Sequence, residues 1–191
     1  MMKNPNLKNL TLAALFLALG LLLPFMTGQI PQIGNMLLPM HLPVFLCGLI
    51  CGWQYGGLVG FVLPLLRSAM FGMPPIFPTA TAMAFELMTY GLTAGLLYSR
   101  ARWQCVFSLY RCLIAAMVAG RVVRGVVQTV LMGISGGVFT FQIFLTQSVL
   151  NAIPGIIAQL LLIPAVMVAL HRTGLVRFQR HDEARHAELH S

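Results

Sequence analysis

The chain has 191 residues, of which 58% are hydrophobic and only 8% are charged, and its mean hydropathy is +0.84. A soluble domain has about 25% charged residues, so the composition excludes an ordinary soluble domain and predicts an integral membrane protein. The formal net charge of +8 does not indicate a nucleic-acid partner, because the basic residues do not form one patch.

Six apolar segments follow one another along the chain. At about 20 residues per span, the length allows one all-α domain of about six membrane helices and leaves no room for a soluble catalytic domain. The second segment is short, and a glycine- and aromatic-rich break at 51–56 separates it from the third. The predicted helices cover residues 10–26, 40–51, 55–71, 79–99, 106–132 and 140–170.

Glycines at steps of four surround this break: Gly48, Gly52, Gly56 and Gly60. Small residues at that spacing let membrane helices approach closely. Because the break lies among them, we expect two tight helix contacts rather than one continuous ridge.

Basic residues are distributed unequally between the two sides of the predicted bundle. With the N-terminus in the cytoplasm, the three outer loops contain no Lys or Arg. The positive-inside rule therefore predicts six transmembrane helices with both termini cytoplasmic, provided that the short second helix spans. Residues 1–172 form the membrane domain and 173–191 a polar cytoplasmic tail. The cytoplasmic segments hold Lys3, Lys8, Arg100, Arg102, Arg111, Arg172, Arg177, Arg180 and Arg185.

Four charged side chains lie inside predicted spans: Arg67, Glu86, Arg121 and Arg124. Each costs about 2.5–3.5 kcal/mol on insertion scales, which makes it a functional-site hypothesis. The balance of three positive charges against one negative favours an anionic ligand such as a small carboxylic acid, because arginine binds carboxylates through two parallel hydrogen bonds.

Other polar residues share helix faces with these charges at one depth, in the outer half of the bilayer. Residues three, four or seven apart lie on one helix face. Three polar faces at one depth predict a pocket that opens to the outside. The faces are Glu86 with Tyr90, Arg121 with Arg124 and Gln128, and Gln147 with Asn151.

Some of these polar residues could instead have purely structural roles. Arg67 and Glu86 are also compatible with an ion pair that closes one helical hairpin, and Gln147 and Asn151 with interhelical hydrogen bonds. His41, near the outer interface, is expected to be a structural residue with satisfied hydrogen bonds.

The sequence offers little for catalysis or for metal binding. It lacks HExxH, GxSxG, CxxC and a nucleotide-binding GxxxxGK[ST], and a single carboxylate, Glu86, lies in the membrane. No His or carboxylate cluster accompanies the cysteines, so we expect no metal, no cofactor, and reduced, buried thiols. Active transport would then need ion coupling or an ATP-hydrolysing partner. The cysteines are Cys47, Cys51, Cys105 and Cys112.

Two features resemble a known family. Ala14 and Ala18 form an AxxxA pattern in the first helix, and residues 36–75 read MLLPMHLPVFLCGLICGWQYGGLVGFVLPLLRSAMFGMPP. Together with six helices and basic inner ends, they resemble the substrate-binding S-component of energy-coupling factor (ECF) vitamin transporters over about residues 8–170.

The resemblance implies a multi-pass protein of a bacterial cytoplasmic membrane that captures a vitamin from outside. It implies docking through Ala14 and Ala18 onto a transmembrane coupling subunit driven by two ATPase subunits, gating by loops 27–38 and 72–78, and toppling in the membrane to release the substrate. Residues 1–172 would be the substrate-binding domain. The GMPP region and the arginine surplus favour pantothenate among carboxylate vitamins.

Other functions are less consistent with this sequence than vitamin capture. An ion-coupled transporter or channel acting as a homo-oligomer is disfavoured, because inverted halves are not apparent and Glu86 is the sole membrane carboxylate. An intramembrane enzyme lacks catalytic pairs, and an assembly factor would bind no small ligand.

Overall fold

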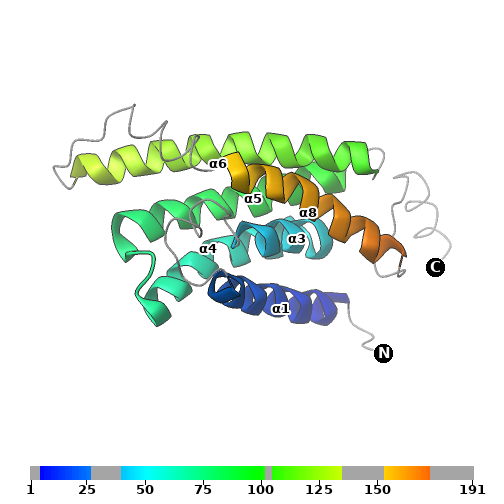
Figure 1. The fold of residues 1–191 in the computed structure, drawn as a ribbon, viewed down its shortest axis with the longest axis horizontal. Helices are drawn as coiled ribbons and strands as arrows, with labels where there is room; N and C mark the ends of the chain where they lie inside the picture. The colour runs from blue at the N-terminus through cyan, green and yellow to red at the C-terminus, as the bar shows by residue number, and fades with distance from the viewer. Residues whose placement is uncertain (1–4, 27–39, 102–104, 135–152, 173–191) are drawn as a thin grey trace.

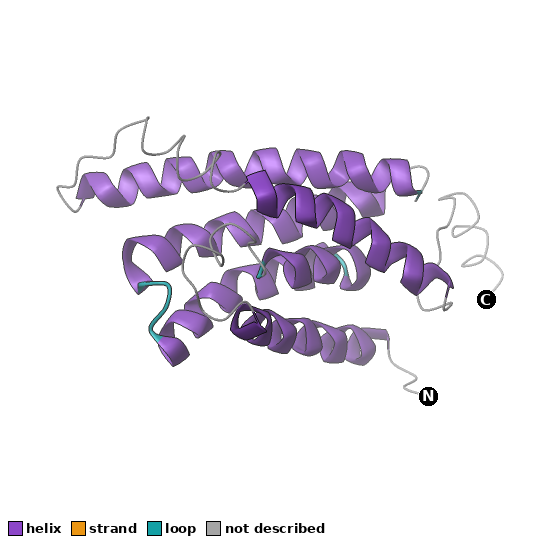
Figure 2. Cartoon of the chain, in the orientation of Figure 1, coloured by secondary structure: helices purple, strands orange, loops and turns teal. Residues whose placement is uncertain are grey.

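The structure is a computed structural model that describes residues 5–26, 40–101, 105–134 and 153–172 (Figures 1 and 2). All regular secondary structure in these ranges is helical. A short turn, η1 (Ile76–Ala80), in which Phe77 has an extended backbone, precedes α5. The six α-helices are α1 (Pro5–Met26), α3 (His41–Cys51), α4 (Trp53–Phe71), α5 (Thr81–Arg100), α6 (Val106–Ile134) and α8 (Ile153–Arg172).

The described residues form an all-helical structure with six α-helices, the predicted number of helices, and the helix ends differ from the predicted ones by a few residues. α1 begins at Pro5 rather than at residue 10, and a proline is favoured at the first position of a helix because its missing N–H would have no helical partner there. The last helix is described from Ile153, so the predicted part at 140–152 lies outside the described residues.

Among the described residues, three helices are long and apolar enough to cross a membrane: Leu7–Phe25, Val106–Gly133 and Pro154–Arg172. The apolar α3 has 11 residues, about 16 Å at 1.5 Å per residue, against a hydrocarbon thickness of about 30 Å. α3 is therefore too short to cross a bilayer by itself.

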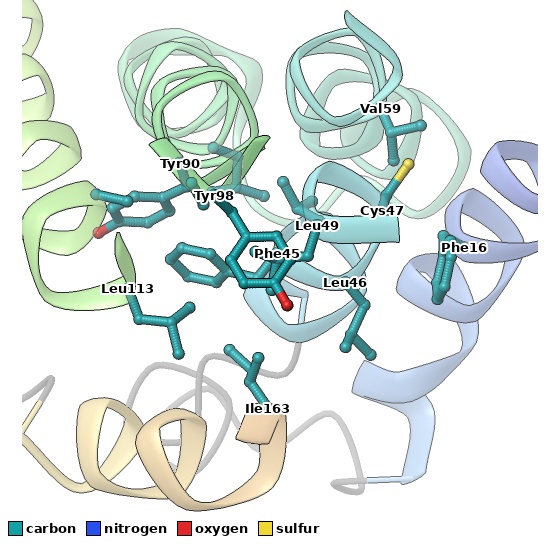
Figure 3. Close-up of a cluster of buried hydrophobic side chains, with 14 of the residues drawn as sticks. Phe16, Phe45, Leu46, Cys47, Leu49, Val59, Tyr90, Tyr98, Leu113 and Ile163 are labelled. Carbon is teal, nitrogen blue, oxygen red and sulfur yellow. The ribbon is translucent and has the colours of Figure 1, made fainter. Parts of the chain in front are cut away.

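This short helix lies at the centre of the bundle, where it contacts α1, α4, α5 and α8. Nine of its 11 residues are buried. Phe45 and Leu46 of α3 meet Tyr90 of α5, Leu113 of α6 and Ile163 of α8 in one apolar cluster (Figure 3). α3 is thus the core element around which the longer helices pack.

Glycine allows α3, α4 and α5 to touch backbone to backbone. A methyl group on Gly91 of α5 would collide with the carbonyl oxygen of Gly56 in α4, and one on Gly48 would lie 2.6 Å from the carbonyl oxygen of Gly91. A methyl group on Gly60 would collide with the carbonyl oxygen of Leu87. The predicted tight contacts at Gly48, Gly56 and Gly60 are confirmed: Gly48 and Gly60 meet the backbone of α5, and Gly56 lies against Gly48 of α3 and near Gly91 of α5.

Gly52 has a different role from these three. Its φ of 97° is a conformation that side chains other than glycine's rarely adopt, and a methyl group there would meet no atom within 4 Å. Gly52 therefore forms the bend between α3 and α4 and does not join the contacts on either side of it.

Four basic residues of the described helices gather at one end of the bundle. α1 begins, α5 ends, α6 begins and α8 ends at this end (Figure 1). Lys8, Arg100, Arg111 and Arg172 lie in or near those helix ends, which we call the basic end. The turn between α4 and α5 lies at the opposite end (Figure 1).

The glycine contacts make a prediction about stability. Gly91→Ala should lower the thermal unfolding midpoint in detergent by several degrees, because the new methyl group meets a backbone carbonyl that cannot rotate away, and overpacking costs about 1–3 kcal/mol. Gly133→Ala is the matched control, since a methyl group there meets nothing within 4 Å. Equal midpoints for both variants would contradict the close-contact interpretation.

Candidate functional site

Glu86 is the only acidic residue of the chain before residue 182, and its side chain is fully buried. It is the sixth residue of α5 and therefore lies in the half of that helix away from the basic end. Tyr90, one turn later on α5, donates a hydrogen bond from its hydroxyl to Glu86 Oε1 at 2.7 Å. The predicted shared face of Glu86 and Tyr90 is confirmed.

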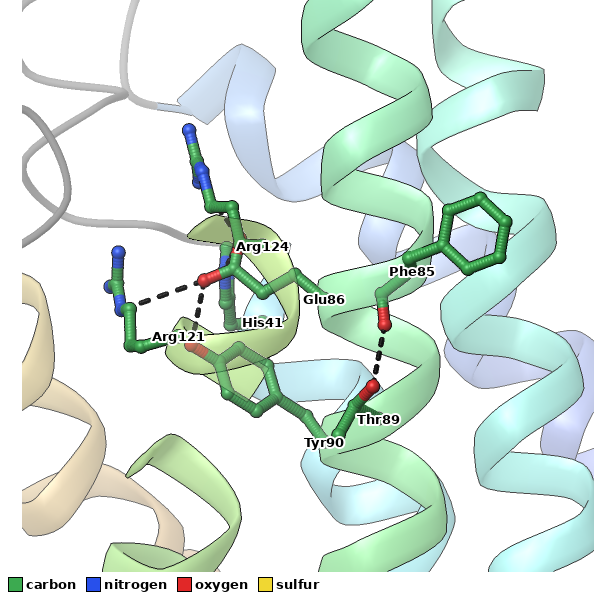
Figure 4. A network of polar contacts seen from close by, with 7 residues as sticks. All are labelled: His41, Phe85, Glu86, Thr89, Tyr90, Arg121 and Arg124. Carbon is green, nitrogen blue, oxygen red and sulfur yellow. Dashed lines mark hydrogen bonds and ion pairs between the residues drawn. The ribbon is translucent and has the colours of Figure 1, made fainter. Parts of the chain in front are cut away.

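Both arginines of α6 converge on this carboxylate (Figure 4). Arg124 Nη1 donates to Glu86 Oε2 at 2.7 Å, and Arg121 Nε lies 3.5 Å from Oε1. The i, i+3 spacing predicted one face for the two arginines, and the contacts confirm it. With a neutral His41, two guanidinium groups and one carboxylate leave this cluster with one net positive charge.

The arginines keep hydrogen-bonding capacity that Glu86 does not use. Each guanidinium has five N–H donors. The Nε atoms of Arg121 and Arg124 are buried without a hydrogen-bond partner among the described residues, and each side chain is only 14% exposed. The cluster can therefore accept a further anion that approaches the two guanidinium groups.

Tyr90 is held in place by packing on both sides. Its ring stacks on Phe45 of α3 with 5.0 Å between centroids. A methyl group on Gly120 of α6 would collide with the Tyr90 ring, so only glycine lets the ring lie against that helix. These contacts fix the hydroxyl that donates to Glu86.

His41 belongs to this cluster, and the expectation that its hydrogen bonds are satisfied was wrong. The side chain is fully buried, and Nε2 lies 3.9 Å from Glu86 Oε2, which is too long for a hydrogen bond. Neither ring nitrogen has a hydrogen-bond partner among the described residues. Sequence reasoning missed His41 because it sits at the start of an apolar helix with no polar residue on its own face.

Arg67 lies elsewhere, at the end of α4. Its Nε donates to the carbonyl oxygen of Met73 at 3.1 Å, and its guanidinium lies 5.9 Å from the centre of the Phe25 ring. The neighbouring Ser68 donates to the carbonyl oxygen of Pro74. The structure does not pair Arg67 with Glu86, because Arg67 is used to hold the turn between α4 and α5.

Of the other predicted site residues, the structure describes Gln128 but not Gln147 or Asn151. Gln128 is buried one turn beyond Arg124 on α6, and it is not among the residues that contact Glu86. Gln147 and Asn151 lie outside the described residues.

The cysteines lie away from the cluster of charges. Cys47, Cys51 and Cys112 are free and buried, as expected, whereas Cys105 is exposed because it lies just before the start of α6.

A family model for the substrate-specific component of ECF transporters matches residues 8–175. The match covers most of the chain, so the protein belongs to this family. It is therefore a membrane protein that serves transport as a substrate-binding subunit and not as an enzyme. Searches against curated proteins and against solved structures give no significant match.

The geometry predicts how the cluster responds to loss of its carboxylate. Glu86→Gln should lower the thermal unfolding midpoint strongly, because two buried arginines lose their counterion, and breaking a buried pair costs about 3–5 kcal/mol. Thr89→Val, which removes a polar group on the same helix, is the control. A midpoint unchanged by Glu86→Gln would show that the arginines do not depend on Glu86.

Proposed function

We propose that this chain is the substrate-capture subunit of an ATP-driven ECF vitamin importer, and that it binds a small anionic vitamin, with a pantothenate-like molecule favoured. The observation that carries this proposal is the cluster of Glu86, Arg121 and Arg124, which retains one positive charge beside unused donors. A bound carboxylate removes the excess charge and pairs with the remaining guanidinium N–H groups.

The distribution of charge supports an orientation with both termini in the cytoplasm, and six crossings would require that more of the chain than the 11 residues of α3 contributes to the second one. The positive-inside rule places the basic end in the cytoplasm. Glu86 is 14 residues from Arg100, which is about 21 Å along α5 at 1.5 Å per residue. The cluster then lies in the outer half of the membrane, where a substrate arriving from outside reaches it.

Docking onto the coupling subunit is proposed to use the outer face of α1. Ala14 and Ala18 are both exposed, whereas Ala13 and Phe16 turn toward the core. Small residues spaced by four let a second helix approach closely. The exposed surface of α1 also carries large apolar residues: Leu7, Leu10, Leu15, Leu19, Leu22 and Phe25. In this proposal, partner ATPase subunits supply the energy for transport.

Ligand binding tests the cluster. The purified protein should bind pantothenate and should bind pantothenol, its uncharged alcohol analogue, at least tenfold more weakly, because only the acid neutralises the arginines. Arg121→Ala should weaken pantothenate binding about tenfold or more, since a hydrogen bond to a charged group contributes about 1.5–3 kcal/mol. Isothermal titration calorimetry measures both differences.

Arg111→Ala is the matched control for this measurement, because Arg111 is an exposed arginine of α6 near the basic end. Its affinity for pantothenate should equal that of the wild type. Unchanged affinity in both Arg121→Ala and Arg124→Ala would remove these arginines from the binding site.

Uptake tests the docking face. Ala14→Trp or Ala18→Trp should abolish ATP-dependent uptake of labelled pantothenate by proteoliposomes that contain the coupling module, while binding to the isolated protein stays intact. Val130→Trp, at an exposed position of α6, is the control and should preserve uptake. Loss of binding together with uptake in the α1 variants would contradict a role limited to docking.

A further inference from the structure

His41 is a buried polar side chain with unmet hydrogen-bonding capacity. It is fully buried, and neither Nδ1 nor Nε2 has a hydrogen-bond partner among the described residues. A buried polar group without a partner costs free energy that an apolar residue of similar shape would not cost. The position therefore calls for a partner that the described residues do not supply.

The position of His41 points to a ligand as that partner. His41 is the first residue of α3, and the N-terminus of a helix carries partial positive charge. Its Nε2 faces Glu86 Oε2 at 3.9 Å, and its ring centre lies 5.4 Å from that of Tyr90. Figure 4 shows the ring beside the carboxylate on which Arg121 and Arg124 converge. In many membrane transporters, the N-terminus of a short helix points at the anionic group of the substrate.

The tautomer of His41 restricts which group it can bind. The neutral imidazole has one donor and one acceptor nitrogen. The negative charge of Glu86 beside Nε2 favours the proton on Nε2, so Nδ1 carries a lone pair and accepts a hydrogen bond. A carboxylate has no proton to donate, so the anionic group that pairs with the arginines cannot also satisfy Nδ1.

We propose that His41 is a substrate-contacting residue whose Nδ1 accepts a hydrogen bond from a hydroxyl group of the substrate. This inference rests on the proposed anion-binding function and narrows it. The substrate is a monocarboxylate, because the cluster has one positive charge to neutralise. It also carries a hydrogen-bond donor separate from the carboxylate, and acids without such a donor are discriminated against at this position.

Substitutions that keep one nitrogen at a time test this assignment. The Asn amide oxygen can replace the acceptor at Nδ1, whereas the Gln amide nitrogen reaches the position of Nε2 and leaves no acceptor at Nδ1. His41→Asn should keep pantothenate binding within about threefold of the wild type. His41→Gln and His41→Phe should weaken it by about tenfold to a hundredfold. Calorimetry gives the affinities, and the thermal unfolding midpoint shows that each variant is folded.

A substrate analogue separates ligand contact from a structural role. Pantothenate in which the hydroxyl next to the amide carbonyl is replaced by hydrogen, and the analogue with the other hydroxyl replaced, are the two probes. One of them should bind the wild type at least tenfold more weakly than pantothenate and should bind His41→Phe no more weakly than pantothenate does. Such a non-additive pair of losses identifies a direct contact.

The possible results separate the two proposals. If the wild type binds pantothenate and every variant discriminates between the acid and its analogues as the wild type does, His41 has a structural role and the inference is wrong. If His41→Asn loses as much affinity as His41→Phe, the acceptor role of Nδ1 is wrong. If the wild type binds neither pantothenate nor its analogues, the proposed pantothenate-like specificity fails, and the assignment of His41 fails with it.

Discussion

The structure depends on one buried carboxylate. A charged side chain in the interior of a membrane protein is stable only when partners replace the water that it has lost. Glu86 obtains them from its own helix through Tyr90 and from α6 through Arg121 and Arg124. The charges on α5 and α6 therefore hold these two helices together, and they also leave the excess positive charge that suits the cluster to an anion.

The approach of the helices makes this arrangement possible. Gly48, Gly56 and Gly91 bring the backbones of α3, α4 and α5 into contact, and Gly120 leaves room for the Tyr90 ring against α6. α3 is short and central, so its first residue, His41, reaches the polar cluster while most of its other residues form the apolar core. The proposed binding residues come from three helices, and apolar and backbone contacts between the helices hold them in position.

Arginine has two different uses in this protein. Arg121 and Arg124 face a carboxylate and retain free donors, whereas Arg67 donates to the carbonyl of Met73 and, with Ser68, holds the turn that follows α4. In hydropathy terms the three residues are equivalent, because each is a charge within an apolar segment. Only the partners distinguish a candidate binding residue from one that orders a turn.

The sequence alone determined the membrane class, the family resemblance, the six helices and the shared faces of Glu86 with Tyr90 and Arg121 with Arg124. These properties follow from local composition and from the helical period of 3.6 residues, which fixes the neighbours within one helix. The tertiary structure decided which helix faces meet. Glu86 pairs with the arginines of α6 rather than with Arg67, and His41 lies beside this pair. Such pairings depend on how distant segments pack, and the spacing of residues along one chain carries no information about that.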